Sequence, residues 1–157
     1  MVMRGSNDAK TEFPGYKWVS RSGDGGHTWT DSEPWTCDDG EAFHSPSSCS
    51  QLIPHSGGRL FWMGNLCAQN PAGNRPRYPI VLGEVDLDTG RLIRGTITPV
   101  DDRRPGESER LTLSNFYVRE DRETGDLLLH MPRFFAGEDS RTDFTTDLFL
   151  YRIPLPL

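Results

Sequence analysis

The sequence predicts an all-β fold, and three observations support this class. Short runs rich in aromatic and β-branched residues alternate with Gly, Asn, Asp and Pro. No segment of about twelve or more residues keeps a helical apolar period free of Gly and Pro. Glycines stand where tight hairpin turns need a positive φ. Together these features predict consecutive antiparallel strands.

The expected strands follow one another along the whole chain, joined by turns. In order they are YKWVSR (16–21), SQLIPH (50–55), RLFWMGNLC (59–67), YPIVLGEVDL (78–87), RLIRGTITPV (91–100), NFYVRED (115–121), DLLLHMPRFF (126–135) and DLFLYRIPL (147–155). Tight hairpin turns are expected at 55–59, 86–91 and 120–126, each of which contains Gly.

A weak internal repeat favours one all-β architecture over others. Two types of hairpin recur in the same order at a spacing of about 65 residues. Four strands joined as successive hairpins form the blade of a β-propeller. The strand count alone would also fit a sandwich or jelly roll. The repeat predicts a β-propeller of about two to two and a half four-stranded blades: a blade end at 16–36, a blade at 45–103 and a last blade at 111–157.

Composition excludes several classes of function. The formal net charge of −6 argues against nucleic acid and against an anionic membrane as partners. The apolar runs are too short to span a bilayer, and no targeting segment is recognisable, so the compartment stays open. The three cysteines form no CxxC pair, which predicts no metal site and favours buried free thiols over one disulfide. No cofactor motif is present, and we expect no cofactor.

The stretch SGDGGHTW (22–29) carries the most specific pattern in the chain. Its spacing S-x-D-x-G-x-T-W is formed by Ser22, Asp24, Gly26, Thr28 and Trp29. The Asp24 carboxylate can accept N–H groups of its own turn, the two hydroxyls can complete the bonding, and we expect Trp29 to pack between neighbouring sheets. The pattern resembles the Asp box, or BNR repeat, of sialidase-like β-propellers, in which these boxes are structural.

This resemblance implies both an architecture and a function. The sialidase-like family forms a six-bladed ring, so the chain is expected to be the C-terminal part of an exo-sialidase-like, or neuraminidase-related, glycoside hydrolase. The remaining blades would be needed to close the ring, and the isolated piece is expected to be inactive. The partner is expected to be a carbohydrate, with an acidic sugar favoured. Arg77, which precedes the apolar run YPIVLGEVD, fits the last of the three substrate-binding arginines of the family.

The chain also departs from the family pattern. The tyrosine expected as nucleophile and its neighbouring Tyr-Glu pair are missing from LTLSNFYV (111–118) and LLLHMPRFF (127–135). Tyr117 lies close by, but we expect it to be a packed core residue. The alternative function is therefore a non-catalytic Asp-box propeller that binds glycans or a protein partner, and the fold alone does not distinguish the two.

Polar residues near the expected strand ends supply the candidate site. The catalytic candidates are Arg77, Glu109 and Arg110, and the substrate-binding candidates are Arg75, Asn65, Glu41 and His44. Paired carboxylates beside arginine suit acid/base chemistry on an anionic substrate. The enzyme interpretation predicts that Arg77, Glu109 and Glu41 converge at one mouth. The alternative is that DDRRPGESER (101–110) is a solvated loop with charges of both signs.

Overall fold

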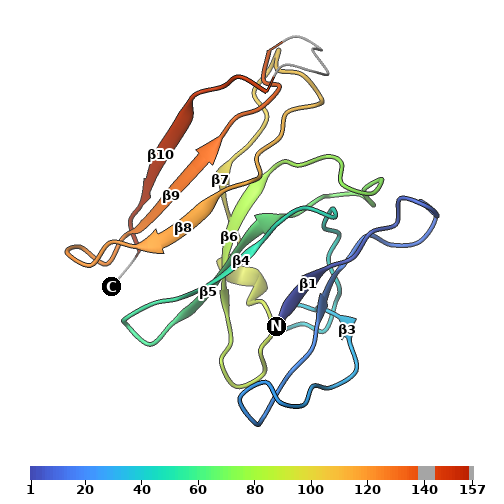
Figure 1. Ribbon diagram of the computed structural model, residues 1–157, viewed down its shortest axis with the longest axis vertical. Helices are drawn as coiled ribbons and strands as arrows, with labels where there is room; N and C mark the ends of the chain where they lie inside the picture. Colours follow the sequence, from blue (N-terminus) through green and yellow to red (C-terminus); the bar gives the residue numbers. More distant parts are fainter. Residues whose placement is uncertain (138–143, 156–157) are drawn as a thin grey trace.

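The computed structural model describes residues 1–137 and 144–155, and within them the chain forms three small antiparallel sheets and no α-helix (Figure 1). The predicted all-β class is confirmed. The first sheet contains β1 (Val2–Arg4), β2 (Lys17–Val19) and β3 (Glu33–Pro34). The second contains β4 (Gln51–Pro54), β5 (Leu60–Asn65), β6 (Ile80–Val85) and β7 (Thr98–Asp101). The third contains β8 (Tyr117–Glu120), β9 (Leu127–Pro132) and β10 (Leu148–Ile153).

Each run expected to form a strand contains one, but the run at 91–100 is divided. Arg94–Thr96 forms the 3-10 turn η1, and β7 begins only at Thr98. The Thr96 hydroxyl donates to the carbonyl of Ile93 at 2.7 Å and accepts the N–H of Glu84 at 2.8 Å, which fixes the turn beside β6. The sequence did not predict β1 and β3, because strands of three and two residues are too short to show alternation.

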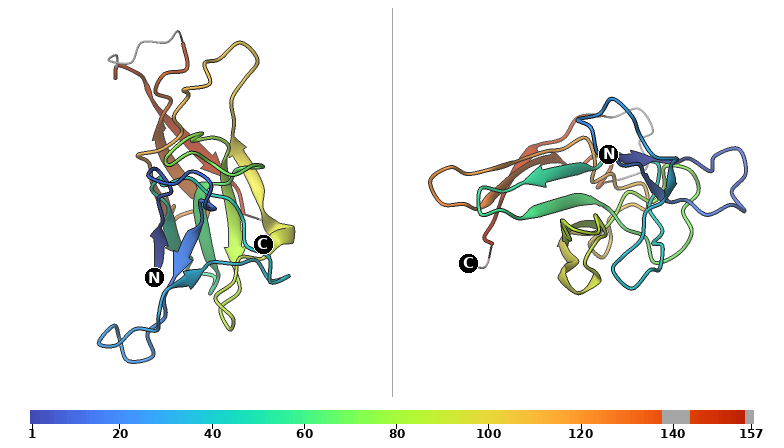
Figure 2. Two further views of the ribbon diagram at one scale, coloured as in Figure 1. Left: turned by 90° about the vertical axis from the view of Figure 1, so that its right-hand side faces the viewer. Right: turned by 90° about the horizontal axis from the view of Figure 1, so that it is seen from below.

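The second sheet lies between the other two and is covered on both faces (Figure 2). Alternate residues of a strand point to opposite faces, so Phe61 and Met63 pack toward the third sheet and Trp62 toward the first. The cluster between the second and third sheets consists of Ile53, Phe61, Met63, Ile80, Leu82, Leu111, Leu113, Val118, Leu127, Leu129 and Met131. The cluster between the first and second sheets consists of Val19, Trp35, Cys37, Phe43, Trp62, Val81, Val85 and Leu92. Each fully buried side chain of this size contributes about 1.5–3 kcal/mol, so these two clusters hold the sheets together.

The turns and the long loops lie at opposite ends of the sheets. The turn that follows β2 and the turn at 86–90 lie at one end, whereas the loop at 102–110 lies at the other (Figures 1 and 2). Of the expected last blade at 111–157, residues 138–143 and 156–157 lie outside the described residues. In the part of the chain that the structure describes, no helix is long and apolar enough to cross a membrane.

The stretch SGDGGHTW (22–29), which resembles an Asp box, closes its own turn between β2 and β3, as the residue pattern predicts. Asp24 accepts the N–H of Thr28 at 2.9 Å, the Thr28 hydroxyl at 2.7 Å and the Ser22 hydroxyl at 2.8 Å. The Ser22 hydroxyl in turn accepts the N–H of Gly26 at 2.7 Å. Gly25 and Gly26 have φ of 72° and 95°, a region that favours glycine. The N–H and the hydroxyl of Thr28, followed by the hydroxyl of Ser22, lower the pKa of Asp24 to about 2.

The expected position of Trp29 is wrong. Its side chain is 47% exposed and does not pack between sheets. Instead, its Nε1 donates to the carbonyl of Gly26 at 3.0 Å, so the indole folds back over its own turn. In this part of the chain Val19 and Trp35 belong to the buried cluster between the first and second sheets. The turn between them, which carries Trp29, lies beyond the core.

The three cysteines are free thiols. Cys37 and Cys67 are buried, as expected, and Cys49 is half-buried. Burial raises the pKa of Cys37 and raises that of Cys67 to about 11, so both stay protonated at neutral pH.

Candidate anion-binding site

Arg75 and Arg77 lie on the loop of residues 66–79, which joins β5 to β6. Two backbone hydrogen bonds between Ala72 and Arg75, of 2.9 and 3.1 Å, close a tight turn in this loop. Gly73 supplies the φ of 58° that the turn requires. The Nε of Arg77 donates to the carbonyl of Asn74 at 3.1 Å. Local hydrogen bonds therefore fix both arginines on one short segment.

The segment of residues 109–113 runs beside Arg77. Thr112 forms a parallel bridge with Arg77, and the N–H of Leu113 donates to the Arg77 carbonyl at 3.1 Å. Arg110 is two residues before Thr112, and its backbone carbonyl accepts the Thr112 hydroxyl at 3.1 Å. Arg110 is half-buried and Glu109 is exposed. The structure thus brings together the two segments that carry the predicted catalytic candidates.

Arg4, Arg75 and Arg77 form an arginine corner without a neutralising carboxylate. Burial lowers the pKa of Arg77, and repulsion from Arg75 and Arg4 adds to this effect. Within residues 1–137 and 144–155, no ion pair involves these three side chains. Other arginines there do contact carboxylates: Arg59, Arg94, Arg133 and Arg152. Because guanidinium groups donate paired hydrogen bonds to carboxylates, the corner is suited to bind one.

Lys17 lies next to the corner and is fully buried. Its Nζ donates to the carbonyls of Pro46 and Ser48 at 3.0 and 2.7 Å, which ties the segment of residues 45–49 to β2. Burial lowers the pKa of Lys17 to about 8. Sequence reasoning did not select this lysine. Its position two residues before Val19, on the inward side of an alternating run, was the available signal.

Cys49 joins the corner to the segment before β8. Its sulfur accepts the N–H of Asn115 at 3.2 Å and lies 3.1 Å from the Ser114 hydroxyl. It also lies near the side chains of Lys17 and Arg77. The corner is therefore assembled from four separate stretches of the chain, around residues 4, 45–49, 75–77 and 109–115.

Asn65 and His44 both contact the backbone of the loop of residues 66–79, at Pro79 and at Cys67. Asn65 is fully buried, and its amide donates to the carbonyls of Pro79 and Leu113 at 3.2 and 3.1 Å. It therefore shapes the loop of residues 66–79 and does not face solvent. His44 is half-buried and stacks on Tyr16 with ring centroids 5.7 Å apart.

Glu41 is not brought to the corner. It is exposed in the turn of residues 38–41, where its N–H donates to Asp39 Oδ1 at 2.9 Å. Asp39 in turn pairs with Arg94 of η1. These contacts hold Glu41 beside η1, so the structure places Arg77 and Glu109 on neighbouring segments and leaves Glu41 apart.

The expectation that Tyr117 packs in the core is wrong. Its side chain is 59% exposed. Val118, the next residue of β8, faces the cluster between the second and third sheets, and alternation then turns Tyr117 to the opposite face. Tyr117 pairs in register with His130 on this outward face. It therefore supplies no nucleophile beside Arg77.

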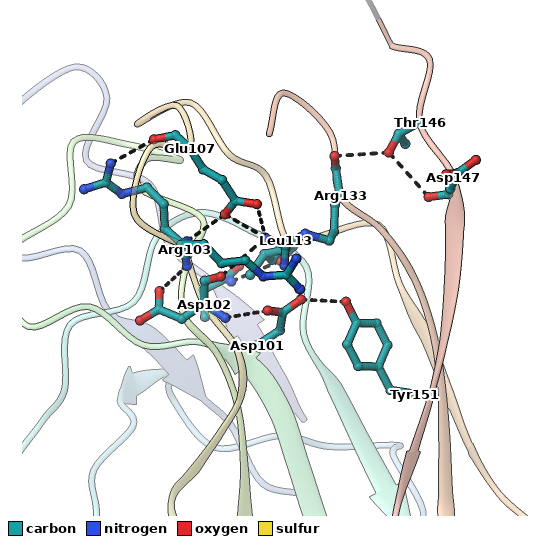
Figure 3. Close-up of polar contacts among 11 residues, drawn as sticks. Asp101, Asp102, Arg103, Glu107, Leu113, Arg133, Thr146, Asp147 and Tyr151 are labelled. Atoms are coloured by element: carbon teal, nitrogen blue, oxygen red, sulfur yellow. Dashed lines mark hydrogen bonds and ion pairs between the residues drawn. The ribbon is translucent and has the colours of Figure 1, made fainter. Parts of the chain in front are cut away.

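Sequence reasoning missed the most buried charged cluster, which joins the second and third sheets (Figure 3). Arg133 follows β9, is only 5% exposed, and donates to Asp101 at the end of β7. It also donates to both oxygens of Glu107 at 2.7 Å. The Tyr151 hydroxyl of β10 donates to the same Asp101 oxygen at 2.5 Å.

The charges in this cluster satisfy one another. Burial would raise the pKa of Asp101, but hydrogen bonds from Tyr151 and Arg133 outweigh it and hold the pKa below its ordinary value. Burial and the neighbouring Asp101 raise the pKa of Tyr151 to about 12. Because each carboxylate already has its donor, we assign this cluster to the stability of the sheet interface. The sequence did not indicate this cluster, because DDRRPGESER (101–110) shows only charges of both signs and Arg133 lies within an apolar run.

Comparison with known proteins identifies no relative. No family model, no curated protein and no solved structure matches the chain. Among the described residues, no group of three or more His, Cys, Asp or Glu side chains is placed to hold a metal ion.

Proposed function

We propose that the chain binds the carboxylate of an acidic sugar at the arginine corner, as the C-terminal part of a sialidase-like β-propeller glycoside hydrolase. Face-to-face stacking of three small sheets supports the propeller interpretation, because this is how neighbouring blades bury their faces. The closed Asp-box turn between β2 and β3 supports the family resemblance.

The binding proposal rests on one observation: the guanidinium groups at the arginine corner have no carboxylate partner among the described residues, although the protein as a whole is acidic. Arg77 is half-buried and repelled by Arg75 and Arg4, and it has no carboxylate partner within the residues described. A bound carboxylate relieves this repulsion and accepts paired hydrogen bonds. We assign contacts with the rest of the sugar to Glu109 and Arg110, because their segment runs beside Arg77.

A non-catalytic propeller is the second candidate, and two positions favour it. Tyr117 projects from the outward face of the third sheet, and Glu41 lies beside η1. The corner therefore has neither Tyr117 as a nucleophile nor Glu41 as a second carboxylate. The second candidate binds glycans or a protein partner, and in the first candidate hydrolysis requires residues from further blades.

Isothermal titration with N-acetylneuraminic acid, glucuronic acid and galactose tests the proposal. We expect the two acids to bind and galactose, which has no carboxylate, to bind at least about tenfold more weakly. Equal affinity for all three sugars would exclude the arginine corner as a carboxylate site. We also expect no release of aryl alcohol from aryl sialosides by the chain alone, and measurable turnover would contradict the assignment of catalysis to further blades.

A further inference from the structure

The first sheet has a free edge beside an apolar hollow. β1 pairs only with β2, so the other side of its backbone carries no ladder partner within the described residues. A hollow of about 430 Å³ lies between the first and second sheets. Its apolar lining includes Val2, Val19, Leu52, Leu60, Val85 and Leu87. An unpaired strand edge beside an apolar surface is the arrangement that extended peptides use for strand addition.

The other sheets show what occupies the equivalent place. In the second sheet β4 is the edge strand that pairs with β5, and in the third sheet β8 is the edge strand that pairs with β9. These two edge strands contact each other: the Gln51 amide donates to the Val118 carbonyl at 2.7 Å and accepts its N–H at 3.0 Å. In the residues described, β1 has no such strand on its free side, and Leu52 of β4 stays only half-buried toward the hollow.

Charge at the two ends of this edge narrows the choice of partner. Arg4 ends β1, and Arg21 lines the hollow with its guanidinium against Gly90. Neither arginine forms an ion pair within the part of the chain described. The lining holds one acidic residue, Asp88, beside Arg21, and Arg4 adds a positive charge at the end of β1. A second copy of this chain paired through β1 would add another Arg4 to the same short ladder, which like charges disfavour.

We infer that the free edge of β1 binds one extended strand of a partner polypeptide, with apolar side chains at alternate positions and acidic residues at its ends. The strand would run antiparallel to β1, direct its apolar side chains into the hollow and pack against Leu52 of β4. The inference does not rest on the sugar site: Arg4 belongs both to the arginine corner and to this edge, but no residue that lines the hollow belongs to the corner.

A strand fused to the chain tests this inference at high effective concentration. The extension places a copy of residues 115–126, which form β8 and its turn, directly before Met1, so that the N–H groups of Val2 and Arg4, which point away from β2, face the added strand. We expect hydrogen exchange of the Val2 and Arg4 amides to slow by at least about tenfold, since both N–H groups would enter a ladder. The thermal midpoint should rise by about 2–4 °C for each kcal/mol gained.

The matched control carries proline at the copy of Arg119, because the N–H of Val118 points to Gln51 and the N–H of the neighbouring Arg119 points to the paired strand. We expect this control to leave exchange and midpoint unchanged. Exchange that the extension does not slow, or that the proline control slows equally, would overturn the inference. Light scattering of the unextended chain should give a mass of 17.7 kDa. If the unextended chain is a dimer and the extension makes it monomeric, the edge pairs with a second copy of the chain. That result would also overturn the inference.

Discussion

The hydroxyl of Tyr151 donates a 2.5 Å hydrogen bond to Asp101, and this contact joins β10 of the third sheet to the end of β7 in the second. Arg133, which follows β9, donates to the same carboxylate oxygen. Asp101 therefore connects β7 both to β10 and to the segment after β9. Apolar packing alone holds sheets together without fixing their register. We interpret this cluster as the contact that fixes how the second and third sheets meet.

Tyr151→Phe should destabilise the protein and change its alkaline titration. Loss of a hydrogen bond to a charged group costs about 1.5–3 kcal/mol, measured by urea unfolding at pH 7. The folded pKa of about 12 lies above the ordinary value of 10.0, so this stabilisation is complete below pH 10 and is lost between pH 10 and 12. Absorbance of tyrosinate should show one late ionisation in the wild type that the variant lacks. A variant with the same late ionisation would contradict this assignment.

Arg133→Met should be among the most damaging substitutions of a charged residue. It leaves Asp101 and Glu107 without their donor at a site where Arg133 is 5% exposed. Breaking a buried ion pair from one side costs about 3–5 kcal/mol. Arg152→Met is the matched control, because its pairs with Asp121 and Asp126 are at the surface and such pairs contribute about 0–1 kcal/mol. Equal loss of unfolding free energy in both variants would refute a special role for Arg133.

Lys17 should make stability rise with pH in the alkaline range. Its folded pKa of about 8 lies below the ordinary 10.5, so the unfolded chain binds more protons between pH 8 and 10.5. Relative to Lys17→Met, which has no such group, the wild type should gain about 3 kcal/mol as pH rises through this window. Unfolding of both proteins at pH 7 and pH 10 measures the difference. A constant difference would show that the lysine is not desolvated in the folded state.

Asp24→Asn should loosen the Asp-box turn without disturbing the core. The carboxylate accepts from Thr28 and Ser22, and the turn is exposed at the tip of its hairpin. We expect amide exchange at Thr28 to quicken by about tenfold or more while core amides of β5 stay protected. The wild type should show the same loosening only near pH 2, because the pKa of Asp24 is lowered to about 2. Unchanged exchange at Thr28 would contradict a locking role.

The sequence predicted the strand regions and hairpin turns well, because alternation and glycine position are local properties. It also predicted that Arg77 and the Glu109–Arg110 pair belong together, and the structure places them on adjacent segments. It could not place Glu41, since the turn of residues 38–41 is fixed by Arg94, more than fifty residues away. The predicted burial of Trp29 and Tyr117 was wrong for a related reason. An aromatic side chain has the same apolar character whether it is buried or exposed, and only the facing sheet decides whether it is buried.

The buried polar residues were the hardest to predict. Lys17 and Arg133 look in sequence like solvated charges, yet they are among the most buried residues of the fold. Their burial depends on partners that lie far along the chain, such as the carbonyl of Ser48 for Lys17 and Asp101 for Arg133. Nothing within a local window signals these partners, and only the assembled sheets do.

We propose that Arg77 recognises a carboxylate, and a comparison of an acid with its ester tests this directly. Binding of N-acetylneuraminic acid and of its methyl ester is measured for the wild type, for Arg77→Ala and for Arg91→Ala, an exposed arginine outside the corner. We predict that the wild type and Arg91→Ala prefer the acid by about tenfold or more, whereas Arg77→Ala binds both forms alike and keeps the affinity for the ester. An undiminished preference for the acid in Arg77→Ala would contradict the proposal.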